Sequence, residues 1–189
     1  MTASRIEVAV AALERGELVG VPTDTVYGVA ADPWNEAAVA RLFILKGRPE
    51  DKPVALLAAS SDQVDEIADL GAAHHLAARH WPGALTLVLR PVVVIPDWIG
   101  TTSVRSVGVR VPDHDELRTL LAATGPLAVT SANRSGEPDT LDDIEAKAVF
   151  GDEIAKYMPG RCPGGVASTV VDATGPELVV LRQGPVSAG

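Results

Sequence analysis

The sequence is poor in cysteine and in aromatic residues. Its single cysteine, Cys162, excludes a disulfide bond within the chain and fits a reducing compartment. Aromatic residues make up 4% of the chain, so a core has to be built mainly from Ala, Val, Leu and Ile. No apolar run approaches the roughly 20 residues of a membrane-spanning helix. The N-terminus lacks the apolar region and cleavage site of a signal peptide, and we therefore expect a cytoplasmic protein.

Positive charge is also scarce. The chain has 16 Lys and Arg against 25 Asp and Glu, a formal net charge of −9. Such a field repels nucleic acid at long range, although a local basic patch can still form. A general RNA-binding role is therefore disfavoured. The length of 189 residues and a hydrophobic content of 47% predict one globular domain over residues 1–189.

Helical and strand patterns alternate without a strict βαβ rhythm. Ser4 and Glu7 have capping-box spacing and predict a helix that ends at Gly16. Other helices are predicted from Asn35 to Lys46-Gly47, after Ser60, over 74–80 and from Asp113, whereas an acidic, less regular stretch follows Gly136. The predicted strands are LVGVP, TVYGVAA, PVALLAA, ALTLVLR, SVRSVGVRVP, LAVTSAN, STVVDAT and LVVLR. We expect an α/β domain with a twisted mixed sheet flanked by helices, rather than a parallel sheet.

Common catalytic and nucleotide-binding motifs are missing. Gly160 and Gly165 have the spacing of phosphate-loop glycines, but Val166-Ala167 stand where that motif requires Lys-Ser/Thr. The four histidines show no metal-ligand spacing, so no protein-held metal is expected. Cys162 has no nearby histidine pattern and is a poor candidate for a nucleophile.

Three cations follow the second predicted helix: Lys46, Arg48 and Lys52. Cations near a helix C-terminus often do no more than complement the helix dipole. Three of them close together repel one another unless an anion bridges them, and arginine offers a bidentate fork to a phosphate or carboxylate. An anion-binding site is the more specific interpretation of these three cations.

Polar residues also gather where apolar strands end. The segment VTSANRSG, the pair Ser168-Thr169 and Arg182 each follow apolar residues, although Ser and Asn are also ordinary turn residues. Arg110 lies between Val109 and Val111, and a cation in such a strand is expected to have a partner. The stretch VPTDTVYGVA is explained either by strand alternation or by hydroxyl groups that face a ligand.

Taken in order, these segments resemble a known family. PTDTVYG, KGRP..KP, WPGALTLVL, VGVRVPDH, TSANRSG, STVVD and LRQG together are similar to the YrdC-like family, the threonylcarbamoyl-AMP synthases. The resemblance runs from Val19 to Gly184. It implies a YrdC-like fold in the short bacterial form, without the additional C-terminal domain of longer members.

The resemblance implies an adenylate-forming nucleotidyltransferase. It would convert L-threonine, bicarbonate and ATP into threonylcarbamoyl-AMP and pyrophosphate, with Mg²⁺ accompanying ATP. A separate transferase complex would then modify adenosine 37 of tRNA, whereas direct tRNA binding has weak support. The implied catalytic residues are Lys46, Arg48 and Lys52; the threonine contacts are Thr25, Arg110, Ser131 and Ser168; the ATP contacts are Arg48, Lys52, Ser106, Asn133 and Arg182.

Two departures from the family pattern leave the charged groups in place. Ala167 replaces a common proline before Ser168, and Ser106 stands where threonine is frequent. Two alternatives stay open. One is a non-catalytic RNA-binding paralogue, which the acidic balance disfavours. The other is a carbamoyl-adenylate-forming relative, which normally forms part of a much longer chain.

Overall fold

A computed structural model describes residues 4–47, 53–99 and 105–187. The helices are α1 (Arg5–Glu14), α2 (Glu36–Lys46), α3 (Ser61–Asp65), α4 (His74–His80), α5 (Asp115–Thr124) and α6 (Asp143–Phe150), with 3-10 turns η1 (Gly71–Ala73) and η2 (Gly151–Glu153). The strands are β1 (Val19–Val21), β2 (Gly28–Ala31), β3 (Ala55–Leu57), β4 (Ala68–Asp69), β5 (Leu85–Pro91), β6 (Val107–Arg110), β7 (Leu127–Ser131), β8 (Lys156–Tyr157), β9 (Thr169–Asp172) and β10 (Val179–Arg182).

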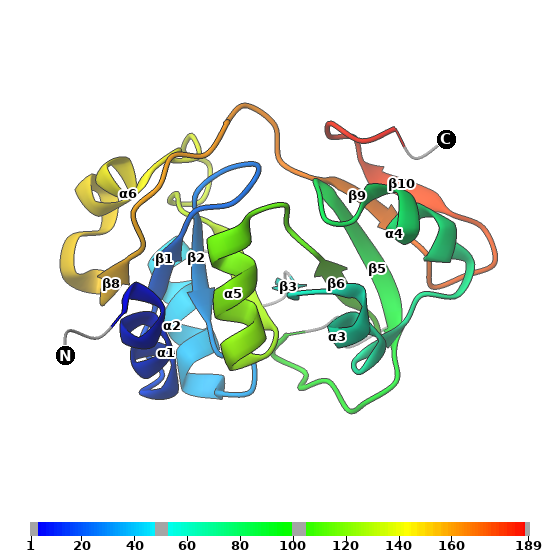
Figure 1. Ribbon diagram of the computed structural model, residues 1–189, viewed down its shortest axis with the longest axis horizontal. Helices are drawn as coiled ribbons and strands as arrows, with labels where there is room; N and C mark the ends of the chain where they lie inside the picture. Colours follow the sequence, from blue (N-terminus) through cyan, green and yellow to red (C-terminus); the bar gives the residue numbers. More distant parts are fainter. Residues whose placement is uncertain (1–3, 48–52, 100–104, 188–189) are drawn as a thin grey trace.

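Within these residues one mixed sheet runs through the molecule (Figure 1). Its strand order is β10-β9-β5-β6-β3-β7-β2-β1-β8, and β4 pairs with β5 outside this path. The pairs β5·β9, β3·β6 and β1·β8 are parallel and the others are antiparallel. The predicted α/β class with a mixed sheet is confirmed.

Local sequence signals set the helix ends. Ser4 and Glu7 form the predicted capping box at the start of α1. In α2, the Asn35 side chain accepts a hydrogen bond from the backbone N–H of Ala38. Gly47 ends this helix with a φ of 62°, a left-handed conformation that glycine adopts without strain. These two caps set the ends of α2, so that Lys46 is its last residue.

Two predictions were wrong. The acidic stretch after Gly136 contains a regular helix, α6, which Asp142 caps and which buries Ala146 and Phe150. Only two of its eight residues are buried, so the sequence of this helix shows no clear apolar periodicity. Between β1 and β2, the residues from Pro22 to Tyr27 form a loop, because β2 begins only at Gly28.

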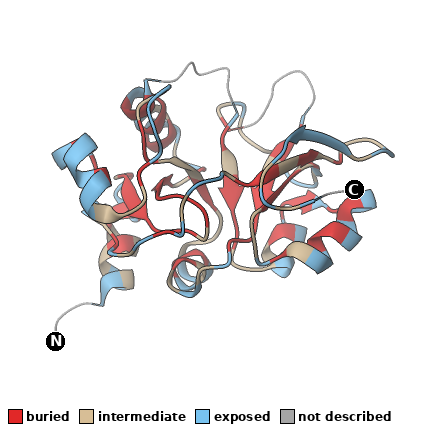
Figure 2. Ribbon diagram, turned by 90° about the horizontal axis from the view of Figure 1, so that it is seen from above, coloured by how far each residue is buried: buried red, intermediate tan, exposed pale blue. Residues whose placement is uncertain are grey.

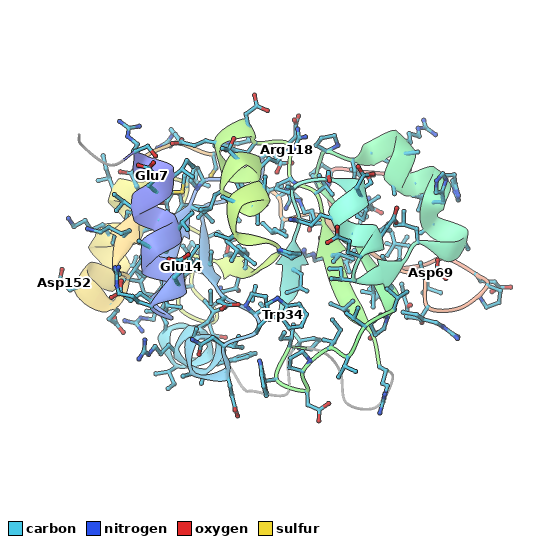
Figure 3. The ribbon with its side chains drawn as sticks, turned by 60° about the horizontal axis from the view of Figure 1, so that its bottom comes forward. Glu7, Glu14, Trp34, Asp69, Arg118 and Asp152 are labelled. Atoms are coloured by element: carbon cyan, nitrogen blue, oxygen red, sulfur yellow. The ribbon has the colours of Figure 1, made fainter. Side chains whose placement is uncertain are left out.

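Helices cover both faces of the sheet at the β1–β2 end. In β2, Val29 and Ala31 join the core beneath α2, whereas Ala30 points to the other face and packs with α1 and α5. The helices α1 and α5 lie side by side on that face (Figure 3). Buried residues concentrate in the sheet, while exposed residues lie on the outer helix surfaces (Figure 2). None of the described helices combines the length and the apolar character needed to cross a bilayer.

Tyr27 fastens the loop after β1 to the far edge of the sheet. Its ring is fully buried, and its hydroxyl donates a 2.6 Å hydrogen bond to the backbone oxygen of Met158, directly after β8. Burial, followed by nearby acidic groups, raises the pKa of the Tyr27 hydroxyl. The folded chain therefore keeps this hydroxyl protonated at pH values where a solvated tyrosine ionises.

Replacing Tyr27 by phenylalanine should lower the free energy of unfolding by about 1 to 2 kcal/mol at pH 7, because the Met158 oxygen loses its donor. Above a pH of about 10, the unfolded wild-type chain ionises at Tyr27 and the folded chain does not, so the wild type loses stability that Tyr27→Phe keeps. The difference between the two should shrink as pH rises. Urea unfolding at pH 7 and pH 10.5 checks this, with Tyr157→Phe as a less buried control; a gap that widens would contradict it.

Candidate functional site

The central strands leave one face open and form a cavity there. Along β5, Leu85, Leu87 and Leu89 enter the core, whereas Thr86 and Val88 line a cavity of about 590 Å³. The registers of the neighbouring strands place further cavity-facing residues on the same side: Ala55 and Leu57 of β3, Gly108 and Arg110 of β6, Val129 and Ser131 of β7, and Val170 and Asp172 of β9. A cavity of this volume suits a ligand the size of a nucleotide.

Arg110 is the most buried charged group of this cavity. It is 5% exposed, at the end of β6. Its Nε donates to the backbone oxygen of Gly83 (2.9 Å), Nη1 donates to Oγ1 of Thr25 (3.1 Å), and Nη2 pairs with Oδ1 of Asp24 (2.5 Å). Burial lowers the pKa of Arg110, and the charge and hydrogen bond of Asp24 oppose that effect. Arg110 therefore has the partner that a cation in an apolar strand is expected to have, and that partner is Asp24.

The loop before β2 presents Thr25 to the cavity. Two long-range bonds hold it in place: the backbone N–H of Gly164 donates to the backbone oxygen of Thr25 (3.0 Å), and that of Thr23 donates to Sγ of Cys162 (3.2 Å). Gly164 has a φ of 79°, and an added Cβ would lie 2.9 Å from Leu141. The Gly/Pro-rich segment near Gly164 thus supports the loop. Burial raises the pKa of Cys162, which disfavours a thiolate nucleophile.

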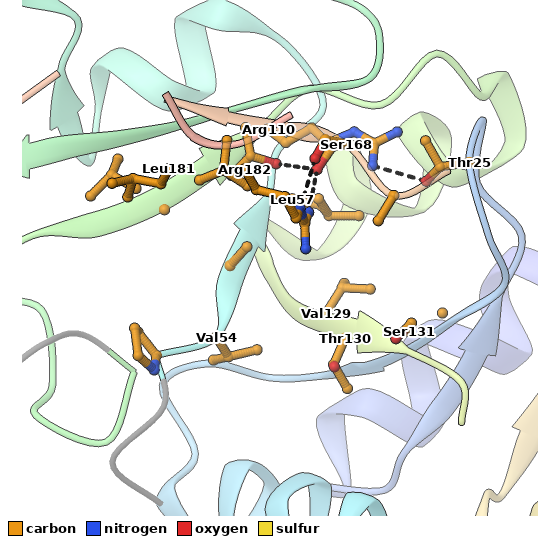
Figure 4. Close-up of a pocket in the computed structure, with 18 of the residues that line it drawn as sticks. Thr25, Val54, Leu57, Arg110, Val129, Thr130, Ser131, Ser168, Leu181 and Arg182 are labelled. Carbon is orange, nitrogen blue, oxygen red and sulfur yellow. Dashed lines mark hydrogen bonds between the residues drawn. The ribbon is translucent and has the colours of Figure 1, made fainter. Parts of the chain in front are cut away.

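A second arginine, Arg182, lines the cavity on the same side as Arg110 (Figure 4). Nε and Nη2 of Arg182, at the end of β10, donate to the backbone oxygen (3.0 Å) and the hydroxyl (3.2 Å) of Ser168. That hydroxyl also lies 2.8 Å from Oγ1 of Thr86. In Figure 4, Arg182, Ser168 and Arg110 lie together, with Thr130 and Ser131 across the hollow. The charge of Arg182 also lowers the pKa of Arg110, as expected for two cations that share one cavity.

Lys46 joins α2 to the segment after β7. Its Nζ donates to the backbone oxygen (2.7 Å) and the hydroxyl (2.8 Å) of Ser131, and to the Asn133 side chain. Two further bonds complete the join: the backbone N–H of Ser135 donates to the backbone oxygen of Lys46 (2.8 Å), and Nη1 of Arg134 donates to that of Leu45 (2.7 Å). The cation and the TSAN segment are thereby held as one unit.

Most predicted site residues that the structure describes line this cavity. They are Thr25, Lys46, Ser106, Arg110, Ser131, Ser168 and Arg182. Asn133 is 7% exposed and does not line it; its amide nitrogen donates to the Glu137 backbone oxygen (2.5 Å) and its oxygen accepts from Ser131 (2.7 Å). Arg48 and Lys52 lie outside the described residues, so their assigned roles stay predictions.

The sequence reasoning missed Asp24, Thr86 and Asp172. Asp24 could have been found, because a buried arginine requires a counter-charge and Asp24 stands in the segment already singled out. Thr86 and Asp172 look like ordinary strand residues, and only the register shows that they face the cavity.

The described lining carries three cations, Lys46, Arg110 and Arg182, and one carboxylate, Asp172. This cationic cavity in a chain of net charge −9 suits an anionic ligand. Oδ1 of Asp172 already accepts from the backbone and hydroxyl of Thr174 (2.9 and 2.7 Å). Among the described residues, no group of three or more His, Cys, Asp or Glu side chains is placed to hold a metal ion.

Comparisons with known proteins agree with this architecture. A family model, Sua5_yciO_yrdC, described as "Telomere recombination", matches residues 11–184. A protein of Mycobacterium tuberculosis is 41% identical over 184 residues, covering 95% of this chain and 83% of its own. The threonylcarbamoyl-AMP synthase of Pseudomonas aeruginosa is 35% identical over 165 residues, covering 85% of this chain and 87% of its own.

A solved structure gives the same result in three dimensions. The crystal structure of Pyrococcus abyssi Sua5 complexed with L-threonine superposes with a TM-score of 0.88 at 39% identity. The match covers 95% of this chain and 54% of the other, so the chain spans about half the length of the Pyrococcus protein.

Removing the Asp24 carboxylate should destabilise the fold, because it leaves the Arg110 charge buried without a counter-ion. We expect Asp24→Ala to lower the free energy of unfolding by about 3 kcal/mol. The matched control is Glu17→Ala, which breaks the exposed Arg15–Glu17 pair and should cost far less, because solvent screens that pair. Urea unfolding compares the two. Equal costs would show that Arg110 does not depend on Asp24.

Proposed function

The chain belongs to the Sua5/YciO/YrdC family, and from that membership together with the cavity we propose that it is an L-threonylcarbamoyladenylate synthase. It joins L-threonine, bicarbonate and ATP into threonylcarbamoyl-AMP and releases pyrophosphate. The observation that carries the proposal is that Arg110 and Thr25 face the same cavity as Lys46 and Arg182. In this proposal, a site for an amino acid and a site for a nucleotide lie side by side in one cavity. The whole chain, 1–189, acts as one YrdC-like domain.

The threonine site is formed by Thr25, Arg110, Ser131 and Ser168. Three of the five N–H groups of Arg110 bind Gly83, Thr25 and Asp24, which leaves two for the substrate carboxylate. Arginine suits this role because its planar fork matches a carboxylate. Ser168 also accepts a hydrogen bond from Arg182, which supports a threonine site beside the nucleotide site.

The ATP site uses Arg182, Ser106 and Asn133 together with Arg48 and Lys52. The Asn133 amide uses three of its four hydrogen-bonding sites on Lys46, Ser131 and Glu137, so one N–H group remains for a contact with ATP. Mg²⁺ neutralises charge on the ATP phosphates. It would be held mainly by phosphate oxygens and water, in keeping with the preference of Mg²⁺ for retaining water.

The chemistry depends on positioning and on charge neutralisation. The amine attacks the carbon of bicarbonate, a C–O bond breaks and water leaves, which gives a carbamate. The carbamate oxygen then attacks the α-phosphate of ATP while pyrophosphate leaves. Bicarbonate, the carbamate and the phosphates are anionic, so the Lys46, Arg48 and Lys52 cations lower the cost of bringing them together. No covalent intermediate with the enzyme is needed.

The product passes in the cytoplasm to a separate transferase complex, which modifies adenosine 37 of tRNA. Of the alternatives, an RNA-binding paralogue requires a basic surface, and the chain as a whole carries a charge of −9. A carbamoyl-adenylate former requires no amino acid, and the buried Arg110–Thr25 pair would then have no zwitterion to bind.

Wild-type protein incubated with ATP, Mg²⁺ and bicarbonate should release pyrophosphate only when L-threonine is added. A coupled pyrophosphate assay with radiolabelled bicarbonate measures both product and dependence. Release without any amino acid would refute the synthase. Tight RNA binding without ATP turnover would favour the paralogue.

Arg110→Lys keeps the charge that balances Asp24 but removes the planar fork. The KM for L-threonine should rise about tenfold or more, while the KM for ATP should stay within about threefold, because the proposed ATP contacts do not include Arg110. Steady-state kinetics check this, with Arg79→Lys on the exposed side of α4 as the control. Parallel changes in both KM values would contradict the division of the cavity into two sites.

A further inference from the structure

The Thr23 hydroxyl forms its three hydrogen bonds within the loop before β2. Its Oγ1 donates to the backbone oxygen of Val26 (2.7 Å) and accepts from the backbone N–H of Thr25 (3.0 Å). It also lies 3.0 Å from Oγ1 of Thr25. A hydroxyl has one proton and two lone pairs. Because a carbonyl oxygen cannot donate, the Thr23 proton belongs to the Val26 bond.

The direction of the Thr25 proton follows from this. In the bond between the two hydroxyls Thr23 can only accept, so Thr25 donates. Thr25 also accepts from Nη1 of Arg110 (3.1 Å). Its proton and one lone pair are therefore used, and one lone pair remains. Thr25 lines the cavity with 4% exposure, so toward a ligand it can act only as an acceptor.

We propose that Thr23 is a positioning residue: it turns the Thr25 proton away from the cavity, so that Thr25 offers a lone pair to the α-amino group of the amino-acid substrate. An acceptor-only hydroxyl repels carboxylate and phosphate oxygens and selects an N–H donor. The inference rests on the proposed function, and it adds which substrate atom Thr25 binds and which residue sets that choice.

Geometry favours the α-amino group over the side-chain hydroxyl of L-threonine. Thr25 Oγ1 and Arg110 Nη1 are 3.1 Å apart, so a carboxylate on Arg110 lies next to Thr25. The α-nitrogen is bonded to the carbon that follows the carboxylate, whereas the hydroxyl is one bond further away. The nitrogen is also the atom that becomes carbamoylated, and Thr25 would thus orient the reacting atom.

The test compares ligands that differ in one group. Binding constants are measured calorimetrically for L-threonine, for L-2-aminobutyrate, which lacks the hydroxyl, and for 3-hydroxybutyrate, which lacks the amine. Thr23→Val keeps the shape of the side chain and removes its hydroxyl. We expect about a five- to tenfold loss of affinity for both amines, the size of one ordinary hydrogen bond, and less than about twofold for 3-hydroxybutyrate. Thr23→Ser should behave as wild type.

Thr25→Val provides a second arm should Thr23→Val fold poorly, with Thr25→Ser as its matched control. It should weaken both amines about tenfold or more, again with a smaller effect on 3-hydroxybutyrate. Equal losses for all three ligands, or a loss confined to those with a hydroxyl, would overturn the inference. If the wild type neither binds nor turns over L-threonine, the proposed function itself fails; if it does both and Thr23→Val matches it, only the inference fails.

Discussion

The buried Arg110–Asp24 ion pair is the interaction on which the site depends. It joins the end of β6 to the loop before β2, and the same guanidinium binds Gly83. A charge that is 5% exposed cannot remain without compensation, so each of these segments must be in place before the site exists. These contacts use three of the five N–H groups of Arg110, and two remain.

The open face of the central strands forms the cavity that Arg110 lines. Side chains alternate across the sheet, so the apolar residues of β5, β6 and β9 fill one core while their neighbours line the cavity. Lys46 comes from a helix end, Arg182 from an edge strand and Thr25 from a loop. The cavity on the sheet is therefore cationic, which suits a reaction that brings several anions together.

Much of this could be predicted from local sequence. The caps at Ser4, Asn35 and Gly47 fixed helices within a residue or two, and the buried strands followed from short β-branched runs. The helix α6 escaped, because its apolar face is narrow and its residues are mostly charged or exposed. Thr25 was predicted as a site residue but placed in a strand, since threonine and valine suit a pleat as well as a loop.

By itself, the sequence determined the α/β class, the family and most of the residues that line the cavity, because those depend on periodicity, composition and short motifs. Only the tertiary structure decided which groups meet. The pairing of Arg110 with Asp24, the contact of Arg182 with Ser168 and the direction of the Thr25 proton all join segments or atoms whose relation depends on strand register and loop path. Hydrogen bonds are sensitive to distance and direction at the scale of tenths of an ångström, and no linear pattern of residues carries that information.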